Sequence, residues 1–406
     1  HASYDTILSS VNQNVLQKQL SRLGDSLFVS NGYSGKDVRI AVFDAGFSEA
    51  NKNPFFDHLF ETDRIVETYD FVDDAPVSYS HASHGTHVLS CIAGKYKNKR
   101  MGLATGAEFL LARTERILTE KMAEEENWFE AMEWADKHGA DIISSSLGYT
   151  YHRYFKQDMN GHTSLVSKAA NIAASKGMLV VVSMGNEGSN RWQVLATPAD
   201  ADSVLSVGGI SPQTGIHIPF SSFGPTSDKR IKPEVSAFGK VVAAGKNQLV
   251  TASGTSFSAP LITGFAACVW QKNRQWDVMK LKREIVKSAD LYPYYDYAHG
   301  YGVPQAAHFV EFGPKPQNDS RSEFSLGITI DENNIILSAP SETAYKLQAN
   351  YNQLFYHIEH RENYLQKFGV ASLEKGNKLR IKNKPAYKGS KFRVYFLGRI
   401  FEKQIP

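Results

Sequence analysis

Cysteine is scarce in this chain: only Cys91 and Cys268 occur among 406 residues, which leaves room for at most one disulfide. Both lie in segments where apolar residues recur at helical spacing, so we interpret them as buried thiols. A bridge between them stays open, because the sequence does not fix whether their Cα atoms lie within the roughly 4.4 to 6.8 Å that the bond requires. The cysteine count therefore does not indicate whether the protein resides in an oxidising or a reducing compartment.

Several other features are absent. No run of 18 apolar residues occurs, which excludes a membrane-spanning helix. No nucleic-acid-binding motif is present. No D-x-[DN]-x-[DN]-G loop occurs, and the scattered acids Asp70, Asp73 and Asp74 do not define a coordination shell. We therefore expect no catalytic metal and no required cofactor, while structural calcium stays open.

The chain begins at His1 and shows no charged-then-apolar leader, so we expect that a signal and any pro-segment were removed or left out. Its length exceeds one usual core, which predicts a large domain with a smaller one appended. Strand and helix patterns alternate between about 36 and 312, which predicts an α/β fold: a largely parallel sheet covered by helices on both faces. Residues 1–35 form an N-terminal arm in this interpretation.

The sequence pattern changes after residue 312, where apolar residues no longer recur at helical spacing. Phe324 to Ile330, Lys378 to Lys382 and Phe392 to Leu397 alternate in polarity and predict half-buried strands. Residues 322–406 therefore predict a small all-β domain, a β-sandwich or jelly-roll-like module. From Lys367 onward, eleven Lys or Arg against two Glu give +9 within a whole-chain charge of +3. This module could bind an anionic surface or glycan, or its charges could form a solvated β face.

Chemistry-bearing residues stand in four short motifs, which are Asp44-Ala45-Gly46, His84-Gly85-Thr86-His87, Gly185-Asn186-Glu187-Gly188 and the segment Gly254 to Pro260. Asp44 ends an apolar, β-branched run, which predicts a buried strand with a carboxylate at its carboxyl end, where catalytic groups gather in open α/β sheets. His84 stands at the amino end of a predicted helix. Ser256 precedes another, predicted over 258–271, with Pro260 in its first turn.

These residue types fit one reaction. A serine hydroxyl is a weak nucleophile and needs a base, which we assign to His84, to take its proton as it attacks a carbonyl. Asp44 would hold the base in one tautomer and stabilise its positive charge. The Asn186 amide and the Ser256 backbone N–H could stabilise the oxyanion that develops.

The order Asp, His, Ser with these flanks resembles the subtilases, the subtilisin-like serine peptidases, and is most like secreted Bacteroidetes members. The resemblance runs from about Tyr33 to about Ala307. It implies a subtilisin-like peptidase domain over 36–312 and a secreted, cell-surface or periplasmic bacterial endopeptidase that forms an acyl-enzyme at Ser256. Its partners would be protein or peptide substrates, and we expect a monomer.

By the same resemblance, one edge of the substrate cleft comprises Ser146, Leu147 and Gly148, and the opposite wall comprises Ser183 and Met184. Ala196 would lie near the pocket base. No charged residue falls at the pocket floor, so we expect an apolar or aromatic side chain before the scissile bond. An extended peptide would bind there by backbone hydrogen bonds.

The chain departs from the common subtilase pattern at three positions. Ala45 offers no hydroxyl where Thr or Ser is usual, Ser144 replaces an Asn, and Phe257 replaces a Met beside the nucleophile. Phe257 cannot form a sulfoxide, which predicts resistance to peroxide.

Two clusters have simpler interpretations. His81, His84 and His87 recur every three residues and could ligate zinc, but His84 is better explained as the base. Glu124, Glu125 and Glu126 could attract basic peptides, but carboxylates at a helix start are favoured anyway.

Two alternative functions stay open: a catalytically idle subtilase-like binding protein, and a processing peptidase of narrow specificity. The sequence favours an active enzyme, because a binding scaffold has no need of all four of Ser256, His84, Asp44 and Asn186.

Overall fold

The computed structural model describes residues 10–76, 79–97, 99–116, 121–310, 326–339, 353–373 and 378–406. The chain divides into two compact units, and each is described by itself. The first comprises His1–Tyr292 and Tyr297–Glu311, and the second comprises Pro293–Asp296 and Phe312–Pro406. The domain boundaries expected at 312 and 322 lie outside the described residues.

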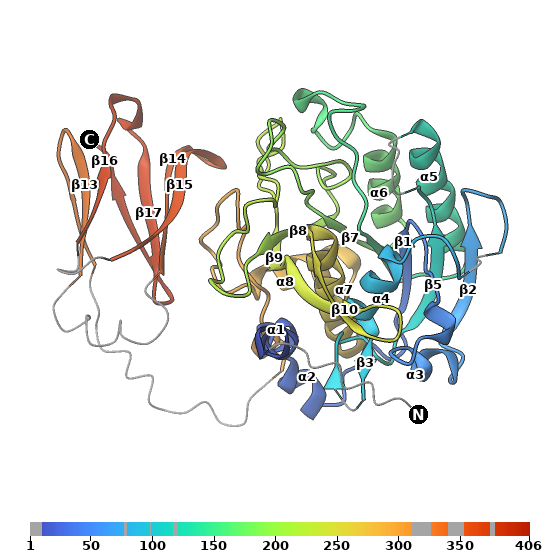
Figure 1. Ribbon diagram of the computed structural model, residues 1–406. Coiled ribbons are helices and arrows are strands. Elements are labelled where there is room, and N and C mark those ends of the chain that lie inside the picture. The colour runs from blue at the N-terminus through green and yellow to red at the C-terminus, as the bar shows by residue number, and fades with distance from the viewer. Residues whose placement is uncertain are drawn as a thin grey trace. The chain divides into compact units, whose positions relative to one another are not determined.

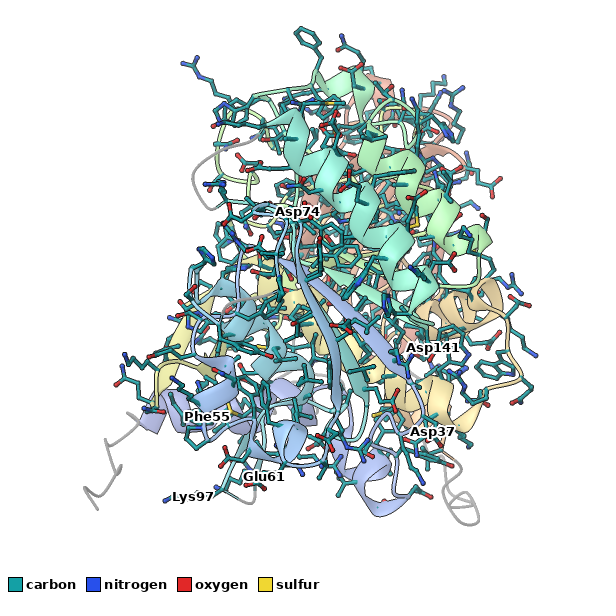
Figure 2. The ribbon with its side chains drawn as sticks, turned by 90° about the vertical axis from the view of Figure 1, so that its right-hand side faces the viewer. Asp37, Phe55, Glu61, Asp74, Lys97 and Asp141 are labelled. Atoms are coloured by element: carbon teal, nitrogen blue, oxygen red, sulfur yellow. The ribbon has the colours of Figure 1, made fainter. Side chains whose placement is uncertain are left out.

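The first unit is built on a seven-stranded sheet in which every pairing is parallel. In sheet order the strands are β2 (Ile65–Asp70), β5 (Glu108–Arg113), β1 (Arg39–Asp44), β6 (Ile142–Ser145), β7 (Leu179–Ser183), β8 (Leu205–Ile210) and β9 (Val235–Phe238). Asp37 and Asp141 lie at the end where β1 and β6 begin, and Asp74 lies at the opposite end, where β2 finishes (Figure 2).

Helices cover both faces of this sheet (Figure 1). Alternate strand residues point to opposite faces, so Ile40 and Val42 join one core cluster while Ala41 and Phe43 join the other. The first cluster includes side chains of α4 (His84–Ala93), α7 (Thr255–Lys272) and α8 (Val278–Lys287). The second includes side chains of α5 (Met122–Lys137) and α6 (Leu165–Ser175). The predicted α/β class, with helices on both faces of a largely parallel sheet, is confirmed.

Short elements complete the unit. They are α1 (Ser10–Ser21), α2 (Asp25–Ser30), α3 (Asp57–Phe60), η1 (Ala50–Lys52), η2 (Lys156–Asp158), η3 (Ala306–His308), and the antiparallel pairs β3 (Lys95–Tyr96) with β4 (Lys99–Arg100) and β10 (Lys240–Ala244) with β11 (Leu249–Ser253). The buried amide of Gln19 ties α1 to β10: Val242 N–H donates to its Oε1 at 3.0 Å, and its Nε2 donates to Val242 O at 3.2 Å.

Cys91 and Cys268 are free, fully buried thiols on α4 and α7, as predicted. Burial raises the pKa of each thiol to about 12. Among the described residues, no helix is long and apolar enough to cross a membrane.

One local prediction was wrong. Pro260 was expected in the first turn of its helix, but α7 begins at Thr255, so Pro260 is the sixth residue. The helix α5 begins at Met122, and Glu124 caps it by accepting a hydrogen bond from Lys121 N–H at 3.0 Å.

The second unit contains two antiparallel sheets. One comprises β12 (Gly327–Ile330), β13 (Asn334–Ser338) and β16 (Lys378–Lys382), and the other comprises β15 (Tyr364–Ser372), β14 (Gln353–Arg361), β17 (Lys391–Phe396) and β18 (Arg399–Gln404), with η4 (Pro385–Tyr387) between β16 and β17. Side chains of both sheets form one core cluster, which includes Leu337, Ile358 and Phe392. The expected small all-β module is therefore present as two packed sheets. The strand prediction missed β13, β14, β15 and β18.

Candidate active site

Three elements of the first unit position the predicted catalytic side chains. Asp44 is the last residue of β1, a central strand of the sheet. His84 is the first residue of α4, and Ser256 is the second residue of α7. The helices α4 and α7 pack against each other. A carboxyl strand end and two helix amino ends thus supply the three groups.

Asp44 and His84 are joined directly. The His84 Nδ1 lies 2.8 Å from Asp44 Oδ1 and 3.0 Å from Oδ2. Because an ionised carboxylate only accepts, Nδ1 carries the proton and Nε2 of the neutral ring is left with its lone pair. Asp44 is fully buried, and its Oδ1 also accepts a hydrogen bond from Ala45 N–H at 2.8 Å. The backbone of residue 45 therefore contacts the carboxylate although its side chain offers no hydroxyl.

The electrostatics of the pair make the imidazole a stronger base. Burial by itself would lower the pKa of His84, but the charge of Asp44 and its hydrogen bond outweigh burial and raise the pKa above the ordinary 6.5. His87 behaves in the opposite way, because burial and the neighbouring His84 lower its pKa. The two histidines thus differ in their readiness to hold a proton.

Gly85 allows α4 to begin this close to β1. A Cβ at position 85 would lie 2.5 Å from Gly46 O and 3.0 Å from Asp44 Cβ, so any larger residue would push the helix away. The glycine after His84 therefore permits the short contact between ring and carboxylate.

Ser256 points to a backbone carbonyl in this structure. Its Oγ donates to Ser146 O at 3.1 Å, and among the described residues no hydrogen bond joins it to the His84 ring. Gly254, just before α7, has φ 145° and ψ 153°, a conformation that L side chains rarely adopt. This turn leads the chain out of β11 and sets Ser256 in the first turn of α7, where N–H groups have no intrahelical acceptor.

Asn186 has its amide oriented by Thr255. Its Oδ1 accepts hydrogen bonds from Thr255 N–H at 2.8 Å and from Thr255 Oγ1 at 3.1 Å. Thr255 Oγ1 in turn accepts from Gly185 N–H at 3.2 Å. With the oxygen engaged in this way, the Nδ2 amide group of the exposed Asn186 can donate to a ligand. Sequence reasoning missed Thr255, although its place between Gly254 and Ser256 in the motif is a signal that could have identified it.

The residues predicted to form the substrate cleft lie at the ends of neighbouring strands. Ser146, Leu147 and Gly148 follow β6, while Ser183 ends β7 and Met184 follows it. Ala196 lies between these two segments: a Cβ at Gly148 would be 2.8 Å from the Ala196 methyl, and one at Gly185 would be 3.1 Å from it.

The side chains of these cleft residues differ in how far they are buried. Met184 is fully buried and belongs to the core cluster of α5 and α6, and Leu147 is 3 % exposed. Gly148, like Ser256, is half-buried.

Phe257 lies against the imidazole. The two ring centroids are 5.4 Å apart with an interplanar angle of 49°, and Phe257 is buried. Ser144 donates or accepts a hydrogen bond with Thr263 Oγ1 at 2.9 Å, which links β6 to α7.

The three histidines of the zinc alternative do not share one site. His81 precedes α4 and lies 3.8 Å from Asp70 and 3.9 Å from Asp73, whereas His84 bonds Asp44. Asp70, Asp73 and His81 place ligand atoms within 4.8 Å of one another. Arg113 already donates to both carboxylates, at 2.7 Å and 2.6 Å. This guanidinium therefore supplies positive charge beside both carboxylates.

Two carboxylates of the acidic run 124–126 have partners within the protein as well. Glu125 is fully buried and accepts hydrogen bonds from Arg153 Nε at 2.8 Å and from Tyr154 OH at 2.7 Å. Glu124 is also buried and caps α5. Both carboxylates therefore hold local structure, and neither is free to attract a basic peptide.

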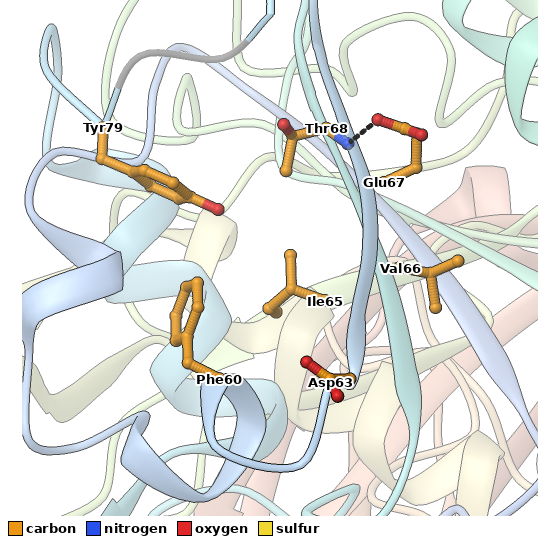
Figure 3. A pocket seen from close by; sticks show the side chains of 7 residues that line it. All are labelled: Phe60, Asp63, Ile65, Val66, Glu67, Thr68 and Tyr79. Carbon is orange, nitrogen blue, oxygen red and sulfur yellow. Dashed lines mark hydrogen bonds between the residues drawn. The ribbon is translucent and has the colours of Figure 1, made fainter.

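A hollow of about 280 Å³ lies elsewhere, beside the edge strand β2. It is lined by Phe60, Asp63, Ile65, Val66, Glu67, Thr68 and Tyr79 (Figure 3). Glu67 Oε1 accepts a hydrogen bond from Thr68 N–H at 3.1 Å, so its carboxylate covers part of the strand edge. None of the predicted site residues lines this hollow.

Comparisons with known proteins agree with this arrangement. A family model described as the subtilase family matches residues 35–303, well over half of the chain. A thermophilic serine proteinase from Bacillus sp. (strain AK1) is 28 % identical over 268 residues, covering 64 % of this chain and 58 % of that protein. The membrane-bound transcription factor site-1 protease of Mus musculus is 28 % identical over 301 residues, covering 70 % of this chain and 26 % of that protein.

Among solved structures, the prenylagaramide maturation protease PagA matches with a TM-score of 0.56 and 25 % identity, covering 71 % of this chain and 97 % of that one. This chain therefore spans nearly all of one relative but only 58 % and 26 % of the length of the two others.

Proposed function

Because the chain belongs to the subtilase family of serine peptidases, we propose that it is a secreted endopeptidase that hydrolyses peptide bonds through an acyl-enzyme on Ser256. The observation that carries the proposal is the buried Asp44 carboxylate bonded to His84 Nδ1, which leaves Nε2 unprotonated at the amino end of α4. A histidine held in this tautomer can accept the proton of a serine hydroxyl.

In the first half of the reaction, Ser256 Oγ turns from Ser146 O toward His84 and attacks the carbonyl carbon of the scissile bond. His84 Nε2 takes the hydroxyl proton, and the carboxylate of Asp44 stabilises the imidazolium that forms. The carbonyl oxygen becomes negative and accepts hydrogen bonds from Asn186 Nδ2 and Ser256 N–H. His84 then gives its proton to the leaving amine as the C–N bond breaks.

The second half repeats these roles with water. His84 Nε2 takes a proton from the water as the water attacks the acyl carbon, and the same donors stabilise the second oxyanion. Collapse releases the acid product and returns the proton to Ser256 Oγ. Apart from the peptide and one water, each step uses only groups of this chain, and none requires a metal or a cofactor.

We propose that an extended peptide lies between the segments 146–148 and 183–184, with an apolar or aromatic side chain before the scissile bond. Backbone groups of both segments would bind the peptide. The Ala196 methyl, close to Gly148 and Gly185, would then limit the depth of the pocket.

We further propose that the second unit binds an anionic glycan or cell-surface polymer. Lys378, Arg380 and Lys382 are exposed and alternate along β16 with the inward-facing Leu379 and Ile381, so the three cations lie on one outer face. Attraction of this kind is long-range and is screened by salt. It suits a secreted or surface-bound bacterial enzyme that works as a monomer near its substrate.

A processing peptidase of narrow specificity is the second candidate. Two of the similar proteins are named as a site-1 protease and as a maturation protease, which describes those proteins. Digestion of a peptide library would separate the two candidates, because a general endopeptidase cleaves many members and a processing enzyme cleaves few.

Reaction with a fluorophosphonate probe tests the proposal against a catalytically idle binding protein. We expect the wild-type chain to be labelled and the Ser256→Ala variant to remain unlabelled. A folded wild-type protein that neither takes up the probe nor cleaves any peptide would refute the proposal.

A further inference from the structure

A proline interrupts the helix that carries Ser256. In an α-helix the N–H of each residue donates to the carbonyl four residues earlier. Pro260 is the sixth residue of α7 and has no N–H, so the carbonyl of Ser256 has no helical donor. A carbonyl left without a donor in a buried place is costly, and another group must satisfy it.

Ser146 provides that group. Its Oγ donates to Ser256 O at 2.8 Å, and the residue is only 6 % exposed. We infer that Ser146 is a positioning residue for the proposed reaction, whose hydroxyl replaces the hydrogen bond that Pro260 cannot make and so fixes the backbone of the nucleophile. The inference rests on the proposed function.

The strand geometry explains why this hydroxyl faces α7. Side chains alternate along a strand, so Ser144 and Ser146 share one side while Ser145 points to the other. Ser144 bonds Thr263 on α7, whereas Ser145 Oγ accepts a hydrogen bond from Trp128 Nε1 on α5, across the sheet. Ser146 continues the Ser144 side just past the end of β6 and meets α7 in its first turn.

The same two residues are joined a second time. Ser256 Oγ donates to Ser146 O at 3.1 Å, so the hydroxyl of each serine donates a hydrogen bond to the backbone carbonyl of the other. For attack, Ser256 Oγ must leave this carbonyl and turn to His84. That turn is productive only if the Ser256 backbone stays in place, because the same backbone also presents the N–H for the oxyanion. The Ser146 hydroxyl holds the backbone during the turn without touching the substrate.

This role predicts a particular kinetic pattern. Removing the hydroxyl leaves the Ser146 backbone carbonyl and the cleft wall intact, so KM should change little. The nucleophile and the oxyanion donor would lose alignment in the transition state, so kcat should fall about tenfold, which corresponds to about 1.4 kcal/mol.

The test measures kcat and KM for a chromogenic peptide, and the rate of fluorophosphonate labelling, on the full-length chain. We expect Ser146→Ala to lose about tenfold in kcat and in labelling rate, and Ser146→Thr, which keeps a hydroxyl, to recover most of both. Ser146→Cys is nearly isosteric but a weak donor, so it should show the same loss without a cavity. It serves in place of Ser146→Ala if that variant does not fold.

Two further variants make the test specific. Ser144→Ala is the matched control, because it removes a buried hydroxyl link between the same strand and the same helix, remote from Ser256, and should keep its kcat. The double variant Ser146→Ala, Pro260→Ala restores an N–H that can donate to Ser256 O, so it should recover much of the kcat that Ser146→Ala loses.

An unchanged kcat in both Ser146→Ala and Ser146→Cys would overturn the inference. An equal loss in Ser144→Ala would also overturn it, because the effect would then be a general loosening of the contact between β6 and α7. A wild-type chain without labelling or hydrolysis would instead defeat the proposed function on which the inference rests.

Discussion

Replacing Asp44 by Asn tests the electrostatic core of the site. The carboxylate oxygens lie 2.8 Å and 3.0 Å from His84 Nδ1. At a separation of about 4 Å between charge centres and an effective dielectric constant near 20, the attraction for an imidazolium is about 4 kcal/mol. Losing that attraction costs about 10³-fold in rate.

The amide of Asn adds a second loss. Its NH₂ can donate to Nδ1, which moves the ring proton to Nε2, where it blocks acceptance of the serine proton. Together these effects predict a fall in kcat of about 10⁴-fold at pH 7. The assay is hydrolysis of a chromogenic peptide by Asp44→Asn and by the wild type, with circular dichroism to check that both are folded.

The pH dependence of wild-type kcat/KM provides a second test of the pair. The base must be neutral, and the pKa of His84 is raised above 6.5, so wild-type kcat/KM should be lost as the pH falls through a pKa above that value. A folded Asp44→Asn variant that keeps its kcat within tenfold of wild type would refute the reasoning, as would a wild-type acid limb well below pH 6.

Three further predictions concern other parts of the chain. Dilute peroxide should leave activity largely intact, because Phe257 stands beside Ser256 where a methionine would form a sulfoxide, and rapid inactivation would contradict this. Burial alone would raise the pKa of Glu234, but the charges of Lys232 and Lys282 lower it to about 2. The ionised Glu234 carboxylate therefore contributes stability that is present above the unfolded pKa near 4.5 and is lost as the pH falls through 2. Urea unfolding should show wild type more stable than Glu234→Gln at pH 7, with the difference shrinking toward pH 2; a constant difference would argue against this linkage. Replacing Lys378, Arg380 and Lys382 together by Ser should abolish retention on an anionic polysaccharide column at low salt, and unchanged retention would refute the proposed surface.

Much of the site could be predicted because its residues stand in strong local patterns. An apolar, β-branched run ends at Asp44, and helical spacing begins at His84, so strand end and helix start followed from the sequence alone. The parallel sheet then brings the carboxyl ends of its strands to one edge, where Asp44 meets His84.

The parts that could not be predicted depend on tertiary contacts. The edge strand β2 exposes Val66 and Glu67 and lacks the continuous apolar signal of the central strands. Glu124 and Glu125 look like a solvated acidic run in the sequence, and only their buried partners show that they hold the fold. The hydrogen bond from Ser146 to Ser256 crosses 110 residues, so no local pattern could reveal it.

Mapping the covalent adduct by mass spectrometry after fluorophosphonate treatment tests the central claim most directly. We predict one adduct per chain, located on Ser256 and lost when His84 is replaced by Ala. An adduct on another residue, or peptide hydrolysis that persists in full after Ser256→Ala, would contradict it.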